Sequence, residues 1–146
     1  MFPRSGEPVD GALRYHSVLK TLLVDIDRAM LQHCLTRVGG RQALAIASSK
    51  AQAMQSLWHE PPDVLVACER LEDGSGLALL DEVHTRWPHL IRVFCAERPR
   101  LALLRTRLGA LRLRHTLLYP LKPAKLELML VHLAHARARP SLRTRS

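Results

Sequence analysis

The side chains best able to do chemistry stand where apolar segments of the chain end. Asp25 and Asp27 follow one such segment, Cys68 ends a second and Cys95 ends a third. Carboxylates are ligands for hard cations, whereas a cysteine reacts or binds a soft metal only as a thiolate. Cysteine is also among the most often buried residue types, so inert packing is the favoured interpretation of both thiols. A redox pair or a soft-metal site is the alternative.

The apolar segments must position these side chains. Apolar, β-branched runs predict buried strands over 18–24, 44–47, 64–67, 90–95 and 115–119. Apolar residues at helical spacing, bounded by capping or breaking residues, predict helices over 27–38, 49–59, 76–86, 99–112 and 123–137. This alternation predicts a parallel sheet with helices on both faces. Working sites in such folds lie at the carboxyl ends of the strands, where we expect Asp25, Cys68, Cys95 and Tyr119 to gather.

Length and composition indicate one globular domain. With 146 residues, 47% of them apolar and 24% charged, the chain is long enough to bury a sizeable core. No apolar run could span a bilayer, no signal peptide is recognisable, and three widely spaced cysteines (Cys34, Cys68, Cys95) indicate reduced thiols in a cytoplasm. We expect a flexible arm at 1–16, a folded domain at 17–137 and a basic tail at 138–146.

The net charge of +9 is compatible with nucleic acid or an acidic partner. Arginine is spread along the chain and is densest near its end, where a charged segment is usually solvated. Only 4% of the residues are aromatic, which leaves no stacking platform for single-stranded nucleic acid. Nucleic-acid binding is therefore possible but not favoured.

Four segments together carry a resemblance to a known family. Segment 24–27 reads Val-Asp-Ile-Asp, and segment 62–66 reads Pro-Asp-Val-Leu-Val. Segment 70–77 reads Arg-Leu-Glu-Asp-Gly-Ser-Gly-Leu, and segment 117–126 contains Tyr-Pro-Leu-Lys-Pro. In this order and spacing they resemble a response-regulator receiver domain of two-component phosphorelay systems, and the last is similar to receivers of hybrid histidine kinases. The resemblance implies a flavodoxin-like α/β fold with strand order 2-1-3-4-5. It also implies an acidic pair after the first strand, a phosphoacceptor aspartate ending the third, Thr or Ser ending the fourth and Lys-Pro ending the fifth.

The chain departs from this pattern at the positions that do the chemistry. Asp25 and Pro120 match, but the second acid, the acceptor, the hydroxyl and the lysine are replaced by Ile26, Cys68, Cys95 and Tyr119. A cysteine cannot form the acyl phosphate, and one carboxylate beside an isoleucine and a thiol is a poor Mg²⁺ site. Asp27 could replace the lost acid, but an aspartate that starts a helix is usually a cap. We therefore expect a degenerate pseudo-receiver that is not an enzyme, binds Mg²⁺ weakly or not at all, and needs no other metal or cofactor.

Three alternatives stay open. An active receiver could use an unusual acceptor, namely Asp63, Glu69 or Asp73. A regulator could bind nucleic acid through the basic tail. A thiol redox sensor could use the two cysteines that end neighbouring strands.

The outward faces of the last two predicted helices form a candidate interaction surface. Leucines of 99–112 face the core and leave small residues and arginines outside, while 123–137 leaves apolar side chains outside beside histidines. The surface residues are Arg98, Ala102, Arg105, Thr106, Gly109, Leu128, Val131 and His132. Because helix 99–112, strand 115–119 and helix 123–137 form the usual partner surface of receivers, the resemblance implies docking of a signalling protein such as a histidine kinase or an output protein, or a homodimer.

Overall fold

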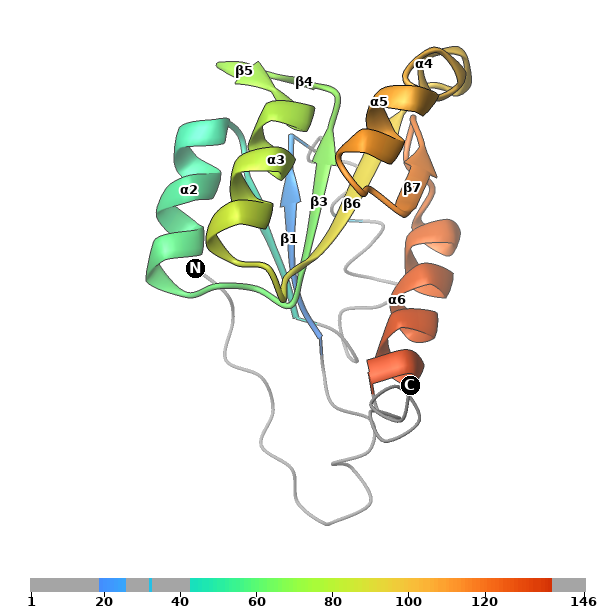
Figure 1. Cartoon of the computed structure of the whole chain (residues 1–146). Coiled ribbons are helices and arrows are strands. Elements are labelled where there is room, and N and C mark those ends of the chain that lie inside the picture. Colours follow the sequence, from blue (N-terminus) through green and yellow to red (C-terminus); the bar gives the residue numbers. More distant parts are fainter. Residues whose placement is uncertain (1–18, 26–31, 33–42, 138–146) are drawn as a thin grey trace, which may run out of the picture.

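The computed structural model describes residues 19–25, 32 and 43–137. Five parallel strands form the central sheet in the order β2-β1-β3-β6-β7, so β7 lies at one edge (Figure 1). Counted along the chain, this is the expected order 2-1-3-4-5. The strands are β1 (Lys20–Val24), β2 (Ala43–Ala47), β3 (Val64–Cys68), β6 (Ile91–Ala96) and β7 (His115–Leu118).

Helices cover both faces of the sheet, as the near-continuous apolar strands require. On one face, α2 (Lys50–His59), α3 (Gly76–Arg86), α4 (Arg98–Leu103) and α5 (Arg105–Ala110) lie together, and α6 (Pro123–Arg137) covers the other (Figure 1). All five residues of β3 are buried, because this strand lies at the centre of the sheet. The helical spacing of 123–137 predicts Leu126, Met129, Leu130 and Leu133 as core side chains of α6. The three leucines are buried, and Met129 packs only partly against the core.

Two serines begin helices where the sequence places capping residues. The Ser49 hydroxyl accepts a hydrogen bond from the backbone N–H of Gln52 at 3.1 Å and starts α2. The Ser75 hydroxyl accepts from the N–H groups of Leu77 and Ala78 and starts α3. Such caps satisfy donors that have no partner inside the helix, which is why both helix starts could be predicted.

The expected continuous helix over 99–112 is wrong, because the structure has two short helices there. The backbone at Leu104 has φ −92° and ψ 6°, which ends α4 before α5 begins. The first turn of α4 holds arginines and no acid, so its charges oppose the helix dipole. Of the expected core leucines, Leu108 is buried and Leu101, Leu104 and Leu111 pack only partly against the core.

A buried arginine on β6 joins α5 to α3. The Arg92 guanidinium donates to the carbonyl oxygens of Leu80 (3.2 Å), Leu111 (3.0 Å) and Arg112 (3.2 Å). The last two carbonyls lie at the carboxyl end of α5, where the helix dipole favours a cation. Burial lowers the pKa of Arg92 from its usual value, and its hydrogen bonds fix the end of α5 against the sheet.

The sequence did not predict a small hairpin that follows β3. It pairs β4 (Arg70–Leu71) with β5 (Gly74–Ser75) in antiparallel fashion. The predicted helix over 27–38 lies outside the described residues apart from Gln32, and so do Ile26, Asp27, Cys34, the predicted arm and the predicted tail. None of the helices in the described ranges is long and apolar enough to cross a membrane.

Candidate functional site

The carboxyl ends of the central strands bring three predicted site residues together. Asp25 follows β1, Cys68 ends β3, and Cys95 is the next-to-last residue of β6. Cys68 and Cys95 are direct partners in the parallel register of β3 and β6, and Val24 is the partner of Ala67. The sequence therefore predicted correctly that these residues meet at the carboxyl ends of the central strands.

Cys68 and Cys95 form a buried pair of free thiols. Both side chains are at least 95% buried, and a hydrogen bond joins the two sulfur groups. This hydrogen bond, then burial, and then the nearby charges raise the pKa of the Cys68 thiol above its usual value. The same hydrogen bond lowers the pKa of the Cys95 thiol, and burial opposes that shift. Because a protonated thiol is a poor nucleophile and a poor metal ligand, Cys68 has little reactivity at neutral pH, while burial shields Cys95 from reagents.

The remaining acid of the predicted pocket, Asp25, stands beside another acid. Its backbone is left-handed (φ 64°), and its N–H donates to the carbonyl oxygen of Ala47 at 2.8 Å. Burial and the negative charge of Glu72 raise the pKa of Asp25. A nearby cation would lower the pKa of a carboxyl group, and none of the described residues acts on Asp25 in that sense.

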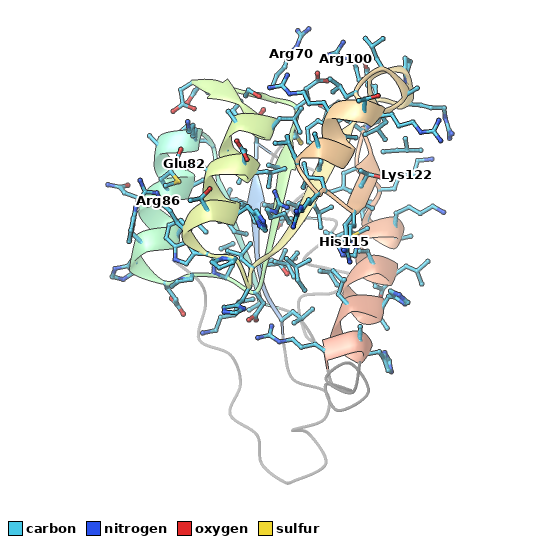
Figure 2. The ribbon with its side chains drawn as sticks, in the orientation of Figure 1. Arg70, Glu82, Arg86, Arg100, His115 and Lys122 are labelled. Atoms are coloured by element: carbon cyan, nitrogen blue, oxygen red, sulfur yellow. The ribbon has the colours of Figure 1, made fainter. Side chains whose placement is uncertain are left out.

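An ion pair next to the thiols joins the end of β3 to α4. Glu69 follows Cys68 directly, and its Oε2 accepts from the Nε of Arg100 at 2.8 Å and from the Nη2 of Arg100 at 2.6 Å. The backbone N–H of Glu69 also donates to the carbonyl oxygen of Cys95 at 3.1 Å. Figure 2 shows Arg100 at the end of the molecule where β3 and β6 terminate. No pattern in the sequence indicates this contact, because the two residues lie 31 positions apart in the chain.

Helix α3 begins in close contact with the backbone of the site. The N–H of Gly76 donates to the carbonyl oxygen of Glu69 at 2.8 Å. A Cβ atom on Gly76 would lie 1.8 Å from the carbonyl oxygen of Cys68, so only glycine fits there. The end of β3 is therefore held by α3 on one side and, through Glu69, by α4.

The three acids that could replace the phosphoacceptor have other partners. Asp63 lies at the opposite end of β3, where it accepts from the N–H of Lys20 at 2.8 Å and pairs with Arg137 at 2.6 Å. Asp73 accepts from the N–H groups of Lys50 and Ala51 at the start of α2, which lowers its pKa. Glu69 is paired with Arg100 as described above. Each acid thus has a structural role in the fold.

No histidine serves the thiols as a base among the residues that the structure describes. His89 precedes β6 and so lies at the end of the sheet away from Cys68, as expected. His115 begins the short strand β7, but its register with Val93 and Val66 places it level with the middle of β3 and not at the far end. Burial first, then the charges of Arg114 and His132, lowers the pKa of His115. Tyr119 follows β7 at the site's end of the sheet, and the Tyr119–Pro120 peptide bond is cis.

The predicted site residues that the structure describes at the carboxyl ends of β1, β3 and β6 are one carboxylate, Asp25, and the two thiols. Mg²⁺ prefers several oxygen ligands in octahedral geometry. In the ranges 19–25 and 43–137, together with Gln32, no group of three or more His, Cys, Asp or Glu side chains could hold a metal ion.

The predicted interaction residues lie mostly at the surface. Exposed side chains are those of Arg98, Ala102, Arg105, Thr106, Gly109, Leu128 and His132, whereas Val131 is half-buried. Helices α4 and α5 lie on one side of the edge strand β7 and α6 lies on the other (Figure 1). The structure therefore places these residues around one edge of the sheet.

Comparison with solved structures identifies the fold. A signal receiver domain of an HD domain-containing protein from Pseudomonas fluorescens Pf-5 matches with a TM-score of 0.70 and 25% identity, over 88% of this chain and 94% of that chain. The chain has the receiver-domain fold of response regulators. A signal receiver domain from Vibrio parahaemolyticus matches with a TM-score of 0.71 and 17% identity, over 88% and 98% of the two chains. A response regulator receiver domain protein from Clostridium thermocellum matches with a TM-score of 0.66 and 19% identity, over 82% and 96%.

These likenesses are carried by the fold and not by sequence motifs. No protein-family model matches the chain, and no curated protein sequence matches it. The receiver-domain fold supports a signalling role for the chain. The correspondence of Cys68, Cys95 and Tyr119 to the functional positions of receivers stays a prediction from the sequence.

Proposed function

We propose that this receiver domain works by binding a protein and does not take up a phosphoryl group. The observation that carries the proposal is the buried Cys68–Cys95 pair at the carboxyl ends of β3 and β6. A thiol there cannot form an acyl phosphate, and neither cysteine supplies an oxygen for Mg²⁺. We therefore expect no enzymatic activity and weak or absent Mg²⁺ binding.

The contacts around the thiols support a fixed state of the site. The Glu69–Arg100 ion pair joins the end of β3 to α4 without any added phosphate. The acids Asp63 and Asp73 are held in other hydrogen bonds, so neither is poised as an acceptor. The expected partner is a signalling protein, such as a histidine kinase or an output protein, bound at the edge formed by α4, α5, β7 and α6.

The test compares partner binding with and without the conditions for phosphorylation. The tagged full chain is crosslinked in an extract of its native cell, once with EDTA and once with Mg²⁺ and acetyl phosphate. We expect the same partner in both samples, with crosslinks mapped to residues 98–137. A partner captured only with Mg²⁺ and acetyl phosphate would contradict the proposal.

A thiol redox sensor is the second candidate, because the sulfur groups of Cys68 and Cys95 touch. The burial of both sulfur groups and the raised pKa of Cys68 oppose it, since oxidation begins with an accessible thiolate, whereas the lowered pKa of Cys95 favours it. The matched variants Cys68→Ser and Cys95→Ser decide between the two functions. If peroxide changes partner binding by the unmodified chain but not by either variant, the sensor function is correct.

A further inference from the structure

The chain segment around the edge strand β7 carries a large excess of positive charge. From Glu97 to Glu127 there are eight basic and two acidic side chains, against 22 and 13 in the whole chain. One of the eight, Arg100, is paired with Glu69. The other seven are exposed, and none of them forms a salt bridge with another described residue: Arg98, Arg105, Arg107, Arg112, Arg114, Lys122 and Lys125. Their charges are therefore available to a partner.

Apolar side chains are exposed in the same segment. Four of the six exposed large hydrophobic residues in the described ranges lie between residues 103 and 128. Leu103 is 72% exposed, Leu128 is 66% exposed, and Leu118 and Tyr119 follow at 42% and 47%. Scattered single leucines need no explanation, but four such residues among seven cations form a surface that is both basic and apolar. We call these eleven residues the basic edge.

We propose that the basic edge binds an acidic and partly apolar face of another protein. This inference rests on the proposed docking function and adds the chemistry of the partner. Carboxylates would complement the cations and speed association, while apolar side chains between them would cover the exposed leucines. The two features match one partner because the cations and the exposed apolar side chains are interspersed along the same segment, as at Leu103, which ends α4, and Arg105, which begins α5.

Two other occupants fit less well. A second copy of the chain would place the same cations against one another, since a symmetric dimer pairs a surface with itself. Nucleic acid would satisfy the cations but would leave Leu103 and Leu128 uncovered, and Tyr119 is the only aromatic residue of the basic edge available for stacking. Both occupants are nevertheless measurable outcomes of the test.

The test measures binding of named probes to the full chain at physiological salt. The probes are a peptide with Glu and Leu at helical spacing, the same peptide with Gln in place of Glu, and a short DNA duplex. We expect the acidic peptide to bind roughly ten times more tightly, or better, than either of the others. The double variant Arg105→Glu/Arg107→Glu should weaken its binding by a similar factor, and Leu103→Ser/Leu128→Ser should weaken it as well.

The control uses an exposed arginine on another helix, which differs from the cations of the basic edge in that it pairs with Glu82. Arg86 lies on α3, on the far side of the molecule from Lys122 (Figure 2), and its reversal in Arg86→Glu should leave peptide binding unchanged. Thermal unfolding of each variant confirms that it folds. Equal or absent binding of the acidic peptide, tighter binding of DNA, or dimerisation lost in Arg105→Glu/Arg107→Glu would each overturn the inference. None of these results depends on phosphorylation, so the proposed function can stand or fail separately.

Discussion

Replacing Gly76 with alanine should damage the fold at the candidate site. A Cβ atom there would lie 1.8 Å from the carbonyl oxygen of Cys68 and 2.9 Å from its carbonyl carbon. Carbon and oxygen atoms in contact normally stay about 3.3 Å apart, so α3 and the end of β3 would have to separate by about 1.5 Å. Neither is a flexible side chain, and α3 anchors four buried residues of the core: Leu77, Leu79, Leu80 and Val83.

The expected cost lies at or above the upper end of the ~1–3 kcal/mol that overpacking usually takes. For a domain of this size, ~3 kcal/mol lowers the midpoint of thermal unfolding by about 10 °C. Gly109→Ala is the matched control, because Gly109 lies on the exposed helix α5 with no atom within 4 Å of an added Cβ. This second change should raise stability by about 0.5–1 kcal/mol, since alanine is the better helix former.

Circular dichroism during heating and in urea measures both variants against the unmodified chain. We expect the two substitutions to shift the unfolding midpoint in opposite directions. The reasoning is wrong if Gly76→Ala unfolds within about 1 kcal/mol of the unmodified chain, or if both alanine variants lose stability equally.

Three further predictions concern other parts of the structure. Arg92→Met should lower the free energy of unfolding, measured in urea, by about 2–4 kcal/mol, because the hydrogen bonds of Arg92 to carbonyl groups involve a charged donor. Arg92→Lys should not restore this stability, since lysine lacks the planar guanidinium group. Full stability of Arg92→Lys would refute this explanation. Iodoacetamide should label Cys68 and Cys95 in peptide maps far more slowly in native than in urea-unfolded protein at neutral pH, because burial and the raised pKa keep Cys68 protonated; equal rates would be inconsistent with the buried pair. The pKa of His115 is lowered in the folded state, so the folded chain binds fewer protons than the unfolded chain near pH 6.5, and stability should fall as the pH drops through that region. The variant His115→Gln should lose less stability over this pH range than the exposed control His89→Gln. Identical pH profiles of the two variants would contradict this expectation.

The sequence predicted the fold well where local signals mark the ends of elements. The bounds of α3 and α6 were expected at Gly76–Arg86 and Pro123–Arg137, and the structure has them there. Ser75 caps the first helix and Pro123 begins the second, which are strong local signals. Five apolar runs between such signals were enough to predict the parallel sheet, whereas its strand order was implied by the resemblance to receiver domains.

The candidate site could be predicted only in its outline. The sequence marks where the strands end, and this was enough to predict that Asp25, Cys68 and Cys95 meet at the carboxyl ends of the central strands. The Glu69–Arg100 ion pair and the burial of Arg92 depend on contacts between distant segments, for which one sequence holds no signal. Local propensity was also misleading between residues 99 and 112, where good helix formers predicted one helix and the structure has two. Arg112, a residue with no preference for a left-handed backbone, takes φ 59° just after the second of them.

We expect that no side chain at the carboxyl ends of the central strands takes up a phosphoryl group. The most direct test incubates the full chain with Mg²⁺ and acetyl phosphate and then measures its intact mass, with a conventional receiver domain treated in parallel as a positive control. We expect the control to gain the mass of one phosphoryl group and this chain to gain none. A stoichiometric phosphoryl group on this chain, mapped to Asp25, Glu69 or any other carboxylate at this edge, would contradict it.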